Sequence, residues 1–432
     1  MTQDDPIGRL LDFLRLSPTP WHATANMAIR LEAAGFRRLD EREAWDLAPG
    51  ERIYVTRNDS SIIALQLPSD PLVALRMIGA HTDSPGLRLK PNAAQSSAGW
   101  LQLGVEVYGG ALLAPWFDRD LGLAGRVHVR RADGCIEGVL LNVDRPVATI
   151  PSLAIHLDRE ANSGRALNAQ TQMAPVFLQG GEHSDLERLL EGWLAEQHGL
   201  EGVEILDFEL GFYDMQPPAS LGVAGELISS ARLDNLLSCF IGLEALLQSD
   251  GSQGAVLVAN DHEEVGSASA CGAQGPFLGD VLRRVTELLG GSDQEDFIRL
   301  IQASRMISCD NAHALHPNFL DKHDAAHGPA INGGPVIKVN ASQRYATNSA
   351  TAAMFRDLCR EVGEPVQTFV TRADMGCGST IGPITATELG VPTLDVGVAQ
   401  WAMHSIRETA GARDVASMTA VLTAFLNRRE PL

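Results

Sequence analysis

Short apolar runs alternate with longer stretches of helical periodicity along most of this chain, and such runs are typical of buried strands. The runs lie at residues 72–78, 255–260, 305–309, 335–340 and 392–398. Helical patterns cover residues 7–34, where Pro18 and Pro20 break the first helix, and also residues 236–247 and about 411–428. Strands that alternate with helices predict an α/β fold with a mixed central sheet flanked by helices.

The pattern changes between residues 91 and 230. Short alternating strands dominate there, at residues 101–108, 126–130, 135–143 and 209–215. We therefore expect a β-rich domain at residues 91–230, inserted into an α/β domain that consists of residues 1–90 and 231–432.

Acidic and histidine residues gather where the apolar runs end or where a helix begins. The positions are His81 and Asp83, Asp234, Glu263 and Glu264, Asp310 and His313, and His404. Ligands of open α/β sheets bind outside the carboxyl ends of the strands. Clusters that are far apart in sequence can therefore converge in one crevice.

Five of these residues form a donor set that suits two zinc-like ions: His81, Asp234, Glu264, Asp310 and His404. One carboxylate, Asp234, would bridge the ions. Asp83 lies two residues after His81 and could accept the other ring N–H of that histidine, which fixes the tautomer of a ligand. Taken singly, each residue would more often be a helix cap or a solvated side chain, but the joint pattern favours a metal site.

Glu263 and Glu264 lie just after the apolar run 255–260, separated from it by Asp261 and His262. Side chains alternate across a strand, so two adjacent carboxylates at its end point in different directions. One can bind a metal while the other moves a proton, which is what metal-assisted hydrolysis requires.

Composition narrows the class of protein further. The formal net charge of −20 argues against nucleic acid and anionic membranes as partners, and it means that any preference for acidic substrates needs a local positive pocket. The six cysteines show no disulfide or metal-knuckle spacing, which fits a reducing, cytoplasmic setting. We expect no signal peptide and no membrane span.

Several motifs in the same order resemble those of the aspartyl aminopeptidase family, and the resemblance covers nearly the whole chain. The motifs are 17-SPTPWHA-23, 79-GAHTDSP-85, 231-ARLDN-235, 262-HEEVGS-267, 308-SCDNAHA-314, 374-DMGCGSTIG-382 and 403-MHSIRE-408. The resemblance implies a metalloaminopeptidase that removes Asp or Glu from peptide N-termini. It also implies a phosphorylase/hydrolase-like zinc peptidase core, with the β-rich domain mediating dimer contacts within a homododecamer.

The resemblance also assigns roles. His81 and Asp310 would bind one Zn²⁺, Glu264 and His404 the second, and Asp234 both, while Glu263 would be the general base. Substrate contacts would come from His313, Lys338 and Tyr345, and from His156, which would reach an active site across a subunit interface.

Some alternatives stay open. His156 could be an oxyanion or substrate residue, an additional metal ligand or a buried structural histidine, and Lys338 could face solvent on a half-buried strand. Co²⁺ or Mn²⁺ could replace zinc. The chain could also be a related two-metal hydrolase for neutral N-terminal residues or N-acyl amino acids, or a scaffold without catalysis. Retention of Glu263 argues against the scaffold.

Overall fold

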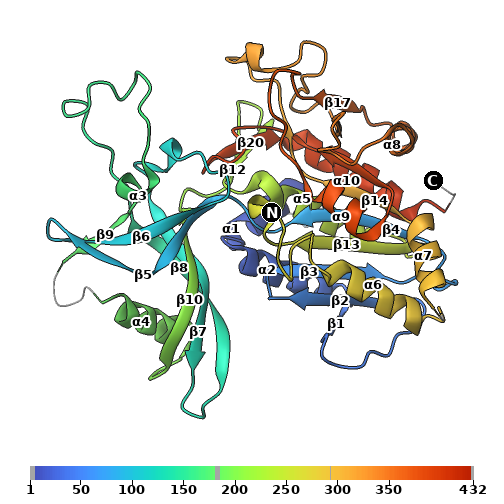
Figure 1. The fold of residues 1–432 in the computed structure, drawn as a ribbon, viewed down its shortest axis with the longest axis horizontal. Coiled ribbons are helices and arrows are strands. Elements are labelled where there is room, and N and C mark those ends of the chain that lie inside the picture. Colours follow the sequence, from blue (N-terminus) through green and yellow to red (C-terminus); the bar gives the residue numbers. More distant parts are fainter. Residues whose placement is uncertain (1–4, 181–184, 292, 430–432) are drawn as a thin grey trace. The chain divides into compact units, whose positions relative to one another are not determined.

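The structure, a computed structural model, describes residues 5–180, 185–291 and 293–429, and the chain divides into two compact units (Figure 1). The first unit comprises Met1–Asp83, Pro218–Met403 and Glu408–Leu432. The second comprises Ser84–Pro217 and the short segment His404–Arg407. The chain thus leaves the first unit directly after Asp83.

A nine-stranded mixed sheet forms the centre of the first unit. Its strands, in spatial order, are β1 (Arg37–Leu39), β2 (Arg52–Arg57), β3 (Ser61–Gln66), β13 (Gly254–Asn260), β4 (Leu75–His81), β14 (Arg305–Cys309), β18 (Thr393–Gly397), β16 (Val336–Val339) and β17 (Gln367–Val370). The four central strands β13, β4, β14 and β18 are parallel, and β13 and β4 pair with Asn260 opposite His81. Their carboxyl ends therefore lie at the same edge of the sheet.

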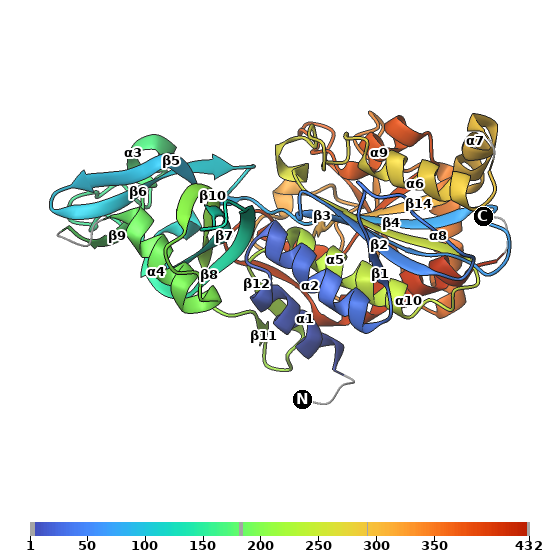
Figure 2. The same ribbon diagram turned by 90° about the horizontal axis from the view of Figure 1, so that it is seen from below.

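Helices cover both faces of this sheet (Figure 2). The helices of the first unit are α1 (Pro6–Leu16), α2 (Pro20–Ala33), α5 (Leu233–Leu247), α6 (Phe277–Leu288), α7 (Gln294–Ala303), α8 (Ser349–Val362), α9 (Ile381–Leu389) and α10 (Ala412–Asn427). Helices α1, α2, α5 and α10 lie on one face, and α6, α7 and α9 lie on the other. The predicted break at Pro18 and Pro20 is confirmed, since α1 ends before these prolines and α2 begins at the second.

Helix α5 is apolar on nearly all sides and is buried along almost its whole length, as expected for a helix enclosed by other elements. It lies directly on β4 and β13. A Cβ atom at Gly242 would come within 2.8 Å of Leu257 Cδ1 and 3.1 Å of Ile78 Cγ2. Glycine at this position therefore permits the close approach of helix and sheet.

A second, small sheet in the first unit has the strand order β11 (Ala219–Leu221), β12 (Leu227–Ser230), β20 (Glu408–Gly411), β19 (Ala399–Trp401) and β15 (Ala312–His313). Short 3-10 helices η2 (Glu263–Val265) and η3 (Leu320–Lys322) complete the unit. Only two residues separate β15 from β14, so the chain passes from the end of this central strand directly into the second sheet.

The second unit contains an antiparallel sheet of six strands. In spatial order these are β8 (Ile136–Ala148), β7 (Leu121–Arg130), β10 (Glu204–Asp214), β5 (Gly86–Ser97), β6 (Trp100–Tyr108) and β9 (Val176–Gln179), accompanied by η1 (Ala114–Trp116), α3 (Ala169–Gln172) and α4 (Leu186–His198). The sequence prediction named only strands here. Helix α4 buries Leu190, Trp193 and Leu194 in the core of this unit, and Asp185 caps its start.

The predicted fold class, a mixed central sheet with flanking helices and an inserted β-rich part, is confirmed by this architecture. No helix among the described residues combines the length and the apolar character that a membrane span requires.

Candidate metal centre

The carboxyl ends of the parallel strands bring together several of the predicted site residues. His81 is the last residue of β4, Asp310 follows β14, and Asp234 lies in the first turn of α5. His81 Nε2 lies 3.3 Å from Asp234 Oδ1 and 3.7 Å from Asp310 Oδ1. All three side chains are buried, so their polar atoms face one another rather than solvent.

Asp83 connects this cluster to the two adjacent glutamates. Its two carboxylate oxygens accept hydrogen bonds from the backbone N–H groups of Glu263 and Glu264, each at 3.1 Å. Its Oδ1 also lies 3.3 Å from His81 Nδ1. A fully buried carboxylate therefore fixes the ring of His81 and the backbone that carries both glutamates.

Glu263 and Glu264 lie in the short helix η2, which two residues separate from the end of β13, so they are not on the strand itself. Burial raises the pKa of Glu263 to about 7, a change that His81 opposes and Asp310 reinforces. Burial also raises the pKa of Glu264 well above its usual value, with the carboxylate of Asp234 as the next cause. Negative charge is therefore crowded at this edge of the sheet.

Asp310 is held from two sides. Lys338 Nζ donates to Asp310 Oδ2 at 3.0 Å, and Asn235 Nδ2 donates to Asp310 Oδ1 at 2.9 Å. Burial alone would raise the pKa of Asp310, but the charges and hydrogen bonds of Lys338 and His81 together outweigh it and hold this pKa well below the usual range.

Lys338 itself is buried rather than solvent-facing, so the alternative that its side chain points to water is wrong. Its ammonium also donates to the backbone oxygens of Asp310 and Asn311, and it lies 4.8 Å from the centre of the Tyr345 ring. The positive charge is thus divided between a carboxylate of the cluster and an aromatic face.

These residues fit a divalent cation. Candidate ligand atoms of His81, Asp234 and Asp310 lie within 4.8 Å of one another, and the same is true of His81, Glu263 and Glu264. Imidazole nitrogen and carboxylate oxygen are the usual zinc ligands besides thiolate. Burial lowers the pKa of His81, but hydrogen bonds to the surrounding carboxylates outweigh this effect and hold the pKa well above its usual value. The cluster therefore favours positive charge at its centre.

A cavity of about 370 Å³ lies in the first unit and is lined by His313 and Tyr345, two of the predicted substrate residues. The ring of His313 packs edge-on against Phe369 with 5.6 Å between the ring centres. Lys322 and Arg372 also line this cavity. Because Tyr345 forms part of the wall and also contacts Lys338, one side of the cavity is only two side chains away from Asp310.

His404 and His156 belong to the second unit. His404 lies between β19 and β20 with a positive φ of 68°, and its Nδ1 is 3.2 Å from the backbone oxygen of Gly110. His156 lies in the exposed segment that follows β8. The structure therefore does not bear out a buried structural role for His156, and the ligand role of His404 stays a prediction.

Sequence reasoning missed two residues that position the cluster. Asn235 holds Asp310, and Glu408 accepts a hydrogen bond from the backbone N–H of Asp234 at 2.9 Å. Both lie inside motifs that had been noticed, next to a predicted ligand or at the end of 403-MHSIRE-408. Both side chains are buried, Asn235 at 0% and Glu408 at 1% exposure, and only the folded structure shows which atoms they contact.

Comparison with known proteins gives consistent results. Residues 13–426 match the aminopeptidase I zinc metalloprotease (M18) family. A probable M18 family aminopeptidase 2 of Pseudomonas entomophila (strain L48) is 58% identical over 425 residues, which are 98% of each chain.

Solved structures agree with the sequence matches. The chain resembles a protein in the cryo-EM structure of the Ape4 and Nbr1 complex, with a TM-score of 0.94, 39% identity and coverage of 98% of this chain and 85% of that one. It also resembles a structure described as the S. cerevesiae mApe1 dodecamer, with a TM-score of 0.85, 27% identity and coverage of 97% and 95%.

Proposed function

The chain belongs to the M18 family of zinc metalloaminopeptidases, and from this premise we propose that it releases N-terminal Asp and Glu from peptides with two divalent ions and Glu263 as general base. The observation that carries the proposal is the buried cluster of His81, Asp234 and Asp310, with Glu263 and Glu264 beside it.

The proposed ions are zinc, with Co²⁺ or Mn²⁺ as substitutes. His81 and Asp310 would hold one ion, Glu264 and His404 the other, and Asp234 both. When bound, such ions polarise a carbonyl group and lower the pKa of a bound water towards neutrality.

Glu263 would move the protons of the reaction. Its carboxylate would accept a proton from the attacking water and then pass it to the leaving amine. Asp83 keeps this carboxylate in place through the backbone, since it accepts the N–H of Glu263. His156, supplied by a second chain, would donate a hydrogen bond to the developing oxyanion.

The preference for acidic residues would arise at the cavity lined by His313 and Tyr345. A protein with net charge −20 needs local positive charge to bind a carboxylate side chain. The candidate cations are Lys338 behind the Tyr345 ring, which also pairs with Asp310, and Arg372 on the cavity wall, which also pairs with Asp374. Both arginine and lysine can bind a carboxylate, arginine with two parallel hydrogen bonds.

Self-association would complete the site, as a homododecamer built from dimers. Three large apolar side chains next to His156 support a contact at this segment, because Leu153, Ile155 and Leu157 are 49%, 49% and 75% exposed in the single chain. We further expect a cytoplasmic protein, since its six cysteines form no disulfide.

The test is hydrolysis of Asp-, Glu- and Leu-nitroanilides by metal-loaded wild type and Glu263→Gln, with metal content measured on both. We expect acid-selective turnover in the wild type and a loss of about 10²–10⁴-fold in the variant at unchanged metal content. Equal turnover of wild type and variant would refute the role of Glu263. Turnover of Leu-nitroanilide or of N-acyl amino acids alone would identify a related two-metal hydrolase instead.

A second pair of variants tests which residue causes the preference for acidic substrates. Lys338→Met and Arg372→Gln each remove one positive charge near the cavity. If Lys338 is the determinant, only its variant lowers the ratio of kcat/KM for Asp- over Leu-nitroanilide. A lowered ratio in Arg372→Gln alone would indicate that Arg372, on the cavity wall, contacts the acidic substrate instead of Lys338.

A further inference from the structure

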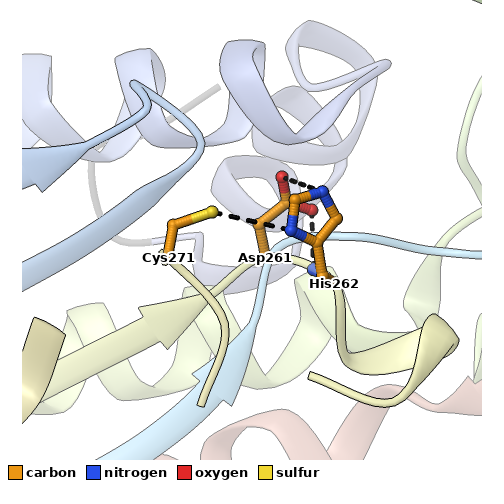
Figure 3. A group of neighbouring side chains, drawn as sticks. All are labelled: Asp261, His262 and Cys271. Carbon is orange, nitrogen blue, oxygen red and sulfur yellow. Dashed lines mark hydrogen bonds and ion pairs between the residues drawn. The ribbon is translucent and has the colours of Figure 1, made fainter. Parts of the chain in front are cut away.

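A second cluster of potential metal ligands lies next to Glu263 and Glu264 but uses different residues. It consists of Asp261, His262 and Cys271 (Figure 3), and one ligand atom from each lies within 4.8 Å of the others. None of the roles assigned above involves these three residues. We propose that they bind a further divalent ion of the zinc class, which links the two ends of the loop that carries Glu263 and Glu264.

The distances suit such an ion. His262 Nδ1 lies 3.5 Å from Cys271 Sγ. Asp261 Oδ2 lies 3.4 Å from the other ring nitrogen, Nε2, and one ligand atom from each of the three residues lies within 4.8 Å of the others. A tetrahedral zinc ion with ordinary bond lengths to sulfur and nitrogen places these two atoms about 3.6 Å apart. The pair of His262 Nδ1 and Cys271 Sγ therefore already has the spacing of two ligands, and the Asp261 carboxylate would turn from the Nε2 side of the ring towards the ion.

A fourth donor is already present. Ser269 Oγ lies 2.8 Å from His262 Nδ1 and 3.6 Å from Cys271 Sγ. Its hydroxyl therefore lies beside both atoms that the ion would join. Either this hydroxyl or a water molecule can complete four-coordination, as in zinc sites with three protein ligands.

Burial separates this cluster from an ordinary surface group of polar residues. Asp261 is 0% and Cys271 3% exposed, while the side chain of His262 is 24% exposed. The thiol and carboxylate are thus shielded from water, and the edge of the histidine ring gives an ion a route of entry. The thiol proton would leave to solvent as the ion binds.

The site encloses a short loop with a defined shape. His262 has a positive φ of 67°, and the backbone N–H of Ser267 donates to its carbonyl oxygen at 2.7 Å. Glu263 and Glu264 lie within this turn. An ion that joins His262 to Cys271 would therefore restrict the loop that carries both glutamates, beyond what Asp83 does from the other side.

The test is optical spectroscopy of the full-length protein, stripped of metal with a chelator and then titrated with Co²⁺. A thiolate bound to Co²⁺ gives a near-ultraviolet charge-transfer band, and the proposed catalytic ligands contain no sulfur. We expect the band in the wild type, its loss in Cys271→Ser together with about one equivalent of bound metal, and its weakening in His262→Gln. Cys135→Ser, which changes an exposed thiol, should keep the band.

Absence of the band in the wild type at saturating Co²⁺ would overturn the proposal without any variant. Persistence of the band in Cys271→Ser would also overturn it, because another thiol would then be the ligand. A Cys271→Ser protein that fails to fold leaves His262→Gln to decide, since an unchanged band in that variant excludes the site. None of these results bears on the aminopeptidase activity, so the two proposals fail separately.

Discussion

Asp83→Asn should separate the positioning of the glutamates from the general stability of the fold. The two oxygens of Asp83 accept the backbone N–H groups of Glu263 and Glu264 at 3.1 Å, inside a fully buried site. Asparagine has one acceptor oxygen and turns an NH₂ group towards the other N–H. The variant therefore loses a hydrogen bond to a charged group, worth about 1.5–3 kcal/mol, and leaves a buried donor unsatisfied at a similar cost.

We expect the free energy of unfolding to fall by about 3 kcal/mol, measured by urea titration. Release of one glutamate N–H also shifts the carboxylate of Glu263, and a displacement of about 1 Å costs on the order of 10²-fold in kcat. The assay is turnover of Asp-nitroanilide with bound metal measured in parallel.

Asp414→Asn is the matched control. Asp414 is also fully buried, and its two oxygens accept the backbone N–H groups of Asn332 at 2.7 Å and Gly334 at 2.8 Å. It should lose comparable stability and keep its kcat. If both variants lose the same fraction of kcat, or if Asp83→Asn loses stability alone, the positioning role of Asp83 is refuted.

Three further predictions follow from packing and charge. Gly242→Ala should destabilise the protein by about 1–3 kcal/mol because its methyl group meets Leu257 and Ile78. Gly192→Ala on α4, where nothing lies within 4 Å, should be neutral or stabilising. Equal urea midpoints of the two variants would refute the close approach. Burial lowers the pKa of His22 from 6.5 to about 4, so on acidification the imidazole is protonated in the unfolded chain before it is protonated in the folded one. The free energy of unfolding should therefore fall by up to about 3 kcal/mol as pH drops from 6.5 to 4. His22→Gln should flatten that part of the pH profile, and an unchanged profile would contradict the prediction. Lys338→Met should cost about 3–5 kcal/mol because it leaves Asp310 as a buried charge without its cation, and the double variant Lys338→Met/Asp310→Asn should recover part of that loss in urea titrations; no recovery would show that the pair is not coupled.

The sequence allowed prediction of the sheet edge that carries the cluster, because apolar runs that end in acids and histidines mark strand ends. His81 ends a central parallel strand, and Asp310 and Glu263 follow two others, as that pattern indicates. The direction of a single side chain could not be predicted in the same way. Lys338 lies on a strand whose neighbours are apolar on both sides, so its burial against Asp310 depends on the pairing of β16 with β18, which no local pattern reveals.

Two other features needed the structure for the same reason. Helix α4 buries Leu190 and Trp193 against strands far away in sequence, and its pattern was overlooked among the strands of that region. Cys271 has no cysteine or histidine at a familiar spacing, because its partner His262 reaches it across a turn rather than along a helix. Contacts made by tight turns escape motif searches that assume regular spacing.

The hydrogen bonds from Glu263 and Glu264 to Asp83 span 180 and 181 residues of sequence. Pairing of β4 with β13 must close this long loop before either bond can form, and such non-local pairing is slow in folding. Partly folded chains therefore possess the ligands without the geometry. Metal binding at this edge should be acquired late, together with the central sheet, so the onset of metal affinity during refolding would report completion of the fold rather than the formation of any local segment.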